Sequence, residues 1–189
     1  MIALPTDTLY ALTALASDAA AVERVYEIKG REEGKPLPLF VADLAAAETI
    51  GSFDRAARCL ARRFWPGPLT IVVRRQPGFE SAALAGADTV ALRAPDHPLA
   101  RALLAALGEA VTATSANRSG GADPVTAAAV RAALGAEVDL VLDGGDCPIG
   151  RSSTIVDCSG ENVSVLRPGA VDTAAITAAL AAATSASRR

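Results

Sequence analysis

KGREEGKP, residues 29–36, contains both lysines of a chain that has sixteen arginines. Lysine is a compact cation on a flexible stem, whereas arginine is a planar fork that binds two oxygens at once. Lys29 and Lys35 on either side of Arg31 therefore suit a polyphosphate, which offers both kinds of contact. The alternative is a solvated charged turn after a helix, with the two glutamates paired to the cations, and this stretch alone does not exclude it.

The composition indicates a globular protein with one domain. The chain has 189 residues, of which 51% are hydrophobic and 4% aromatic, so it can bury a substantial core. Its formal net charge is −3, which provides no overall basic field to attract nucleic acid. An anion site in this chain must therefore be a local cluster of cations.

Several classes of site and location are disfavoured by what the sequence lacks. The three cysteines show no metal-ligand spacing and are expected to be reduced thiols of a cytosolic protein. His97 is the single histidine, which disfavours Ser/His and Cys/His triads, and we expect it only to start a helix. No apolar run approaches the roughly 20 residues that span a bilayer, and the N-terminus lacks a signal-peptide pattern. We therefore expect a cytoplasmic location and no membrane partner.

Hydrophobic periodicity and turn residues predict strands mixed with helices in one α/β domain. The predicted strands cover residues 1–4, 37–42, 69–74, 89–93, 111–113, 138–142, 154–157 and 163–166. The predicted helices cover residues 19–28, 43–50, 54–64, 99–107, 126–134 and 172–183.

Polar, glycine-containing loops recur directly after apolar strands, following Leu4, Arg93, Ala113, Leu142 and Leu166. Each loop alone is compatible with an ordinary turn. In open α/β sheets, however, ligands bind at the carboxyl ends of strands. The recurrence predicts one shared cleft lined by hydroxyls and cations, and it does not identify the ligand.

Seven motifs in series resemble the YrdC family, the threonylcarbamoyl-AMP synthases. They are PTDTLYAL (5–12), KGREEGKPL (29–37), FWPGPLT (64–70), LRAPDHP (92–98), TSANRSG (114–120), GRSSTIVD (150–157) and LRPGAV (166–171). The resemblance implies a twisted, open, mixed α/β sheet with helices around it and a large concave basic cavity. It also implies a YrdC-like domain over residues 1–171, without the helix that relatives carry before the first strand. Residues 172–189 are then a C-terminal helix and a frayed tail.

The activity implied by the resemblance is condensation of L-threonine, bicarbonate or CO2, and ATP. The products are L-threonylcarbamoyl-AMP, pyrophosphate and water. This is the first step of N6-threonylcarbamoyladenosine formation in tRNAs that read codons starting with A. The implied partners are a tRNA threonylcarbamoyl-transferase complex, which receives the product, and RNA through a weak contact. Mg2+ enters through the ATP phosphates, and no protein residue is expected as a metal ligand.

The resemblance also implies roles for ten residues. The expected ATP contacts are the clamp Lys29, Arg31 and Lys35, of which Lys29 and Arg31 are the catalytic pair, and Thr89, Asn117 and Arg167. The expected L-threonine contacts are Thr8, Arg93, Ser115 and Ser153. The chemistry agrees, because an arginine can take the amino-acid carboxylate bidentately. Hydroxyls that bond the substrate hydroxyl reject analogues lacking it.

Two other functions remain as alternatives. An RNA-binding module could use the same basic cavity without catalysis, but the acidic net charge and scarce aromatics disfavour it. A degenerate relative retained as a binding protein is the other alternative. The presence of Lys29, Arg31, Ser115 and Asn117 argues against it.

Overall fold

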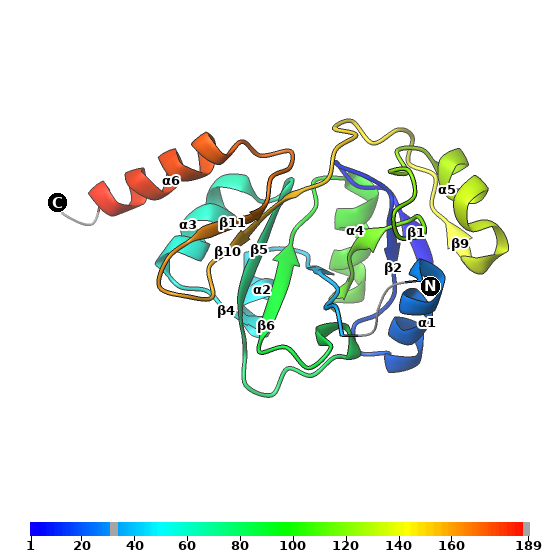
Figure 1. The fold of residues 1–189 in the computed structure, drawn as a ribbon, viewed down its shortest axis with the longest axis horizontal. Helices are drawn as coiled ribbons and strands as arrows, with labels where there is room; N and C mark the ends of the chain where they lie inside the picture. The colour runs from blue at the N-terminus through cyan, green and yellow to red at the C-terminus, as the bar shows by residue number, and fades with distance from the viewer. Residues whose placement is uncertain (31–33, 187–189) are drawn as a thin grey trace.

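The computed structural model describes residues 1–30 and 34–186 and shows a mixed α/β fold (Figure 1). The helices are α1 (Ala19–Lys29), α2 (Leu44–Ile50), α3 (Arg55–Phe64), α4 (Pro98–Leu107), α5 (Ala127–Leu134) and α6 (Thr173–Ala186), with 3-10 turns η1 (Ala82–Leu84) and η2 (Gly135–Glu137). The strands are β1 (Ile2–Leu4), β2 (Ala11–Thr13), β3 (Leu39–Phe40), β4 (Gly51–Ser52), β5 (Leu69–Arg75), β6 (Thr89–Arg93), β7 (Val111–Thr112), β8 (Thr114–Ser115), β9 (Leu140–Val141), β10 (Thr154–Asp157) and β11 (Ser164–Arg167). The predicted fold class is confirmed.

The strands divide between two mixed sheets, where the sequence led us to expect one. The first sheet has the order β8-β2-β1-β9, and the second has the order β11-β10-β5-β6-β3-β7 with β4 beside β5. The division occurs at Ala113, because β7 pairs with β3 in the second sheet and β8 pairs with β2 in the first. The polar loop that follows β8 therefore lies at the junction of the two sheets.

Helix starts and ends follow local signals in the sequence. Asp18, Asp43 and Asp54 each accept a hydrogen bond from the backbone N–H three residues later, at 2.8 to 3.0 Å. Such a cap satisfies an N–H that the first helical turn leaves unpaired and contributes about 1 kcal/mol. His97 also caps α4, as expected, but its Nδ1 accepts from the N–H of Leu99, two residues later, at 3.3 Å. Gly30 ends α1 in the left-handed region, with φ 56°.

Aliphatic side chains from both sheets form the core between the strands and the helices. Leu12 from the first sheet and Leu39, Ile71 and Leu92 from the second are fully buried, as is Leu60 of α3. Each such side chain contributes about 1.5–3 kcal/mol through removal from water. This packing fixes the strand ends from which the polar loops emerge.

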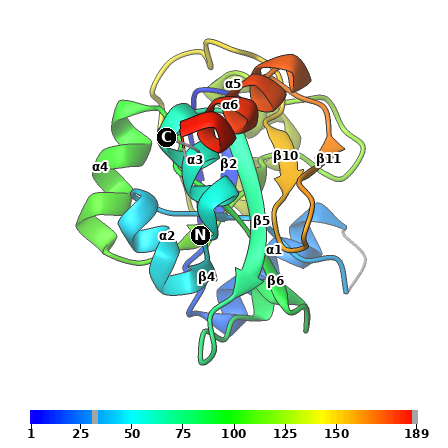
Figure 2. The same cartoon turned by 90° about the vertical axis from the view of Figure 1, so that its left-hand side faces the viewer.

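The helices surround the sheets. In Figure 2, α2 and α4 lie on one side of the second sheet and α1 lies on the opposite side. Helix α6 packs on α3, where Arg55 donates to the carbonyl of Ala183 and the thiol of Cys59 lies 3.5 Å from the carbonyl of Ala179. Within the described ranges, no helix combines the length and apolarity needed to cross a membrane.

Several short strands differ from the sequence-based expectation. Strand β2 lies inside PTDTLYAL, where a loop is expected, and it pairs antiparallel with β1. Strand β4 has two residues and pairs with β5. Runs of two or three residues are too short for side-chain alternation to reveal. The strand expected over 37–42 shrinks to Leu39–Phe40, and its later start follows from Pro38, which has no N–H to donate to a ladder.

Candidate active site

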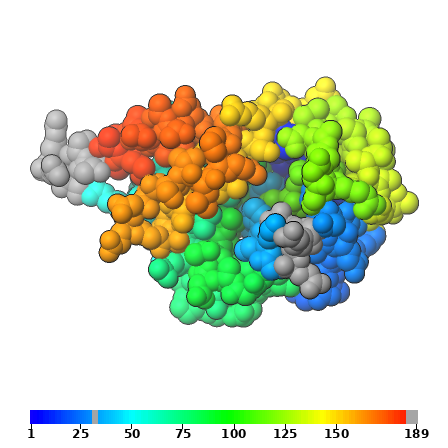
Figure 3. All heavy atoms as spheres, in the orientation of Figure 1, coloured from blue at the N-terminus to red at the C-terminus, as the bar shows by residue number. Residues whose placement is uncertain are grey.

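A cavity of about 730 Å³ opens between the two sheets. Strands β2 and β8 of the first sheet and β5, β6, β10 and β11 of the second contribute to its wall. In Figure 3 this face is hollowed between the orange segment of β10 and β11 and the yellow-green loop after β8. Eight of the ten predicted site residues line it: Thr8, Lys29, Thr89, Arg93, Ser115, Asn117, Ser153 and Arg167.

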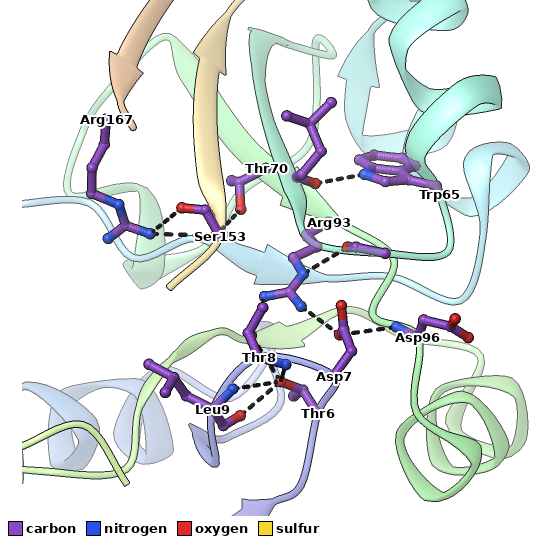
Figure 4. A network of polar contacts seen from close by, with 12 residues as sticks. Thr6, Asp7, Thr8, Leu9, Trp65, Thr70, Arg93, Asp96, Ser153 and Arg167 are labelled. Carbon is purple, nitrogen blue, oxygen red and sulfur yellow. Dashed lines mark hydrogen bonds and ion pairs between the residues drawn. The ribbon is translucent and has the colours of Figure 1, made fainter. Parts of the chain in front are cut away.

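Thr6 fixes the turn between β1 and β2. Its hydroxyl accepts from the backbone N–H groups of Thr8 (3.1 Å) and Leu9 (3.2 Å) and donates to the carbonyl of Leu9 (2.7 Å). A side chain that closes a turn on its own backbone in this way holds the following residues in one conformation. As a result, the side chains of Asp7 and Thr8 both reach Arg93 (Figure 4).

Arg93, at the end of β6, has its guanidinium held from three directions. Its Nε donates to the carbonyl of Gly67 at 2.9 Å, and its two terminal nitrogens donate to Thr8 Oγ1 at 2.8 Å and to Asp7 Oδ1 at 2.5 Å. The Cζ atom lies 5.5 Å from the centroid of the Phe40 ring. A guanidinium has five N–H donors, so these bonds, counted over the described residues, leave one N–H on each terminal nitrogen. Because Arg93 lines the cavity, these two N–H groups can donate to an anion bound there.

Asp7 and Arg93 form a buried ion pair. Their side chains are 6% and 5% exposed, so solvent screens the pair little. Burial lowers the pKa of the Arg93 guanidinium, and the negative charge of Asp7 opposes that shift. Asp7 Oδ1 also accepts from the N–H of Asp96 at 3.1 Å, whereas its Oδ2 is buried and has no hydrogen-bond partner among the described residues.

Sequence reasoning gives Asp7 no role beyond being a polar group after a strand. The pair with Arg93 joins residues 86 positions apart. The only local signal is an acidic residue inside a turn between apolar strands, and such residues are common in ordinary turns.

Ser153, directly before β10, is fixed by three neighbours. Its hydroxyl lies 2.9 Å from Thr70 Oγ1, and the guanidinium of Arg167 donates to its carbonyl at 2.8 Å and to its hydroxyl at 3.3 Å (Figure 4). Gly169 packs on the same backbone, since a Cβ there would lie 2.4 Å from the carbonyl carbon and oxygen of Ser153. The glycine of LRPGAV is therefore required for this close approach. Desolvation lowers the pKa of Arg167, and Asp123 opposes this shift.

Lys29, the last residue of α1, is buried against the loop after β8. Its Nζ donates to the carbonyls of Ser115 and Asn117, both at 2.6 Å, and lies 2.7 Å from Asn117 Oδ1 and 3.2 Å from Ser115 Oγ. An ammonium has three N–H donors, so four oxygens saturate it. The N–H of Ser119 also donates to the Lys29 carbonyl at 2.9 Å. Lys29 thus attaches the loop to the end of the helix.

Of the other expected ATP contacts, Lys35 and Thr89 differ from Lys29 in their position, and Arg31 is outside the described residues. Lys35 is exposed and lies outside the set of described residues that line the cavity, and its carbonyl accepts from the hydroxyl of Tyr26 at 3.0 Å. Thr89 is half-buried on β6 in the cavity wall. Arg31, with Glu32 and Glu33, lies outside the described residues.

The cavity wall is basic, as expected. Three cations, Lys29, Arg93 and Arg167, line it in the described part of the chain, against one carboxylate, Asp123. Over the same residues, no group of three or more His, Cys, Asp or Glu side chains is arranged to hold a metal ion. The described part of the wall offers cations, amides and hydroxyls to a ligand.

Comparison with known proteins points to one family. The family model for Sua5, YciO and YrdC proteins, which carries the description telomere recombination, matches residues 1–169. A threonylcarbamoyl-AMP synthase of Bacillus subtilis is 40% identical over 173 residues, which are 90% of this chain and 50% of that protein. A putative threonylcarbamoyl-AMP synthase of Mycobacterium tuberculosis is 39% identical and covers 92% of this chain and 80% of its own length.

Solved structures agree with the sequence relatives. The crystal structure of Pyrococcus abyssi Sua5 complexed with L-threonine superimposes with a TM-score of 0.90 at 36% identity. The match covers 94% of this chain and 53% of that one, so the chain spans about half the length of the Bacillus and Pyrococcus proteins. The motif-based resemblance is confirmed, and the chain belongs to the Sua5/YciO/YrdC family.

Proposed function

We propose that the chain is a threonylcarbamoyl-AMP synthase, a nucleotidyltransferase acting on L-threonine, bicarbonate or CO2, and ATP. One observation carries the proposal: a single basic cavity brings two kinds of group together. These are the two remaining N–H donors of Arg93 and the loop after β8, which is rich in amides and hydroxyls and is held by Lys29. The names of the Bacillus and Mycobacterium relatives and the threonine complex of the Pyrococcus protein support it.

L-Threonine binds at the Arg93 side of the cavity in this proposal. The substrate carboxylate takes the two remaining N–H donors of Arg93, one oxygen to each terminal nitrogen. The hydroxyls of Thr8, Ser115 and Ser153 line the same cavity and bond the polar groups of the amino acid. A buried hydroxyl left without its partner is costly, so the site rejects amino acids that lack the threonine hydroxyl.

ATP takes the remaining cations and amides. Lys29, Arg31 and Lys35 neutralise the triphosphate, and Thr89, Asn117 and Arg167 complete the nucleotide contacts. Lys29 reaches a phosphate oxygen by exchanging one of its four oxygen contacts in the loop after β8. A buried cation that already lies beside Asn117 needs little reorganisation to do so.

The reaction proceeds by positioning, without a protein nucleophile. The threonine amine combines with bicarbonate to give a carbamate and water. A carbamate oxygen then attacks the α-phosphorus of ATP in line, the bond to the β-phosphate oxygen breaks, and pyrophosphate leaves with the electron pair. Arg93 holds the amino acid against rotation, while the clamp cations stabilise charge that develops on the phosphates.

Mg2+ accompanies ATP in this proposal as part of the nucleotide substrate. The described residues do not form a metal cage, and Asp123 is the single carboxylate among those that line the cavity. Bound through phosphate oxygens and water, the ion neutralises phosphate charge and needs no cluster of protein ligands. The product passes to a tRNA threonylcarbamoyl-transferase complex in the cytoplasm, with at most a weak RNA contact by this chain.

Pyrophosphate release tests the proposal. Purified chain is incubated with ATP, Mg2+, L-threonine and bicarbonate, and each component is omitted in turn. The expected result is release that requires L-threonine and bicarbonate. Release independent of L-threonine contradicts the proposal, whereas tight, salt-sensitive RNA binding without turnover supports the RNA-binding alternative.

A further inference from the structure

Asp7 places a full negative charge behind the ligand-facing donors of Arg93. Its Oδ1 lies 2.5 Å from one terminal nitrogen of Arg93, and that nitrogen carries one of the two N–H groups left for a ligand. Both side chains are buried. An anion that binds Arg93 therefore also experiences the repulsion of a nearby carboxylate that water screens poorly.

The carboxylate of Asp7 is fixed in this position. Oδ1 accepts from both Arg93 and the N–H of Asp96, and the Asp7 carbonyl accepts from the N–H of Ile149 at 3.0 Å. Oδ2 is buried and, among the described residues, has no hydrogen-bond partner that would neutralise it. The charge cannot turn away when a ligand arrives, and Figure 4 shows Asp7 between Arg93 and Asp96.

The repulsion grows with the charge of the ligand. A carboxylate carries one negative charge, whereas a terminal phosphate or sulfate carries two. The ion pair of Arg93 with Asp7 offers two N–H donors but almost no net charge, so it gains little from the second charge of a dianion. The fork then selects by hydrogen-bond geometry and not by charge.

We propose that Asp7 makes the Arg93 side of the cavity selective for a singly charged carboxylate over phosphate-like dianions. The selection rests on the proposed function only in naming L-threonine as the carboxylate and ATP as the excluded ligand. In a cavity with several cations, it keeps the triphosphate away from the amino-acid site and so fixes which substrate occupies which side.

Competition between small anions and L-threonine tests the selection. Inhibition constants of sulfate and formate against L-threonine are measured at pH 8 for the wild type and for Asp7→Asn, which keeps an oxygen facing Arg93 and removes the charge. The expected result is a sulfate constant lowered by about tenfold more than the formate constant, because the dianion carries one extra charge. Equal shifts for both anions, or weaker binding of both, contradict the proposal and leave Asp7 only a structural support of Arg93.

The controls separate charge from folding and from the proposed function. Asp96 has an exposed side-chain carboxylate, and its backbone N–H donates to Asp7. Asp96→Asn removes that carboxylate and is expected to leave the ratio of the sulfate and formate inhibition constants unchanged. If Asp7→Asn fails to fold, Asp7→Ser, with a smaller neutral acceptor, is measured in the same way.

A wild type that releases no pyrophosphate with L-threonine rejects the proposed function. In that case calorimetric titration with sulfate tests the selection by Asp7 without turnover. The proposal requires Asp7→Asn to bind sulfate more tightly than the wild type, and equal or weaker binding contradicts it.

Discussion

The two buried cations that line the cavity in the described part of the chain are held in different ways. Arg93 uses three of its five N–H donors on other described residues, whereas the three N–H donors of Lys29 are shared among four oxygens of the loop after β8. Arg93 is therefore fixed with donors directed to a ligand, while Lys29 first supports a loop. Cationic residues of similar burial can thus be a recognition site in one place and a structural support in another.

Replacing Arg93 is expected to have the largest effect on the use of L-threonine. Arg93→Lys keeps the charge but loses the fork, and we expect kcat/KM for L-threonine to fall by about a hundredfold or more. Pyrophosphate release at varied L-threonine measures it. Arg101→Lys is the matched control, since Arg101 is exposed and its nearest carboxylate, Asp96, lies 3.7 Å away. Equal activity of the two variants contradicts the role of the fork.

Lys29→Met tests whether the lysine supports the loop. Methionine keeps most of the stem but leaves the partly buried oxygens of Ser115 and the buried oxygens of Asn117 without their donor. We therefore expect the unfolding free energy to fall by about 2–3 kcal/mol. Urea unfolding and faster amide exchange in residues 115–121 measure this, and turnover is expected to be lost as well. Lys35→Met, at an exposed position, is the control. A Lys29→Met protein as stable as Lys35→Met is incompatible with the support role.

Gly169→Ala tests how closely the Arg93 side depends on packing. The new Cβ would collide with the backbone of Ser153, and we expect a loss of about 1–3 kcal/mol in stability together with a higher KM for L-threonine. The matched control is Gly160→Ala, where a Cβ has nothing within 4 Å. If both substitutions leave KM unchanged, the position of Ser153 does not govern threonine binding.

Lys35→Ala is expected to have the smallest effect on activity. Lys35 is exposed and outside the described wall, so solvent screens its charge. We expect KM for ATP to rise by about tenfold or less, with KM for L-threonine unchanged. Kinetics at varied ATP measure the change, and a larger effect on L-threonine than on ATP overturns the assignment of Lys35 to the nucleotide.

Much of the fold is predictable because its signals are local. The aspartate caps at 18, 43 and 54 and the exit of α1 at Gly30 depend on residues within one helical turn. The division into two sheets is not predictable in this way, since it depends on which distant strands pair on either side of Ala113.

The site is predictable in composition but not in its internal contacts. Motifs in the sequence predict eight of the side chains that line the cavity. The pairing of Asp7 with Arg93 and the saturation of Lys29 join residues that are 86 to 88 positions apart. Such contacts depend on how the two sheets are packed against each other. The hydrophobic periodicity of a single stretch of sequence does not reveal that packing.

A crystal structure with L-threonine and a non-hydrolysable ATP analogue tests the central claim most directly. We expect the threonine carboxylate to bond both terminal nitrogens of Arg93 while the triphosphate lies on the side of Lys29 and Lys35. A phosphate group bound to Arg93, with the amino acid elsewhere, would contradict it.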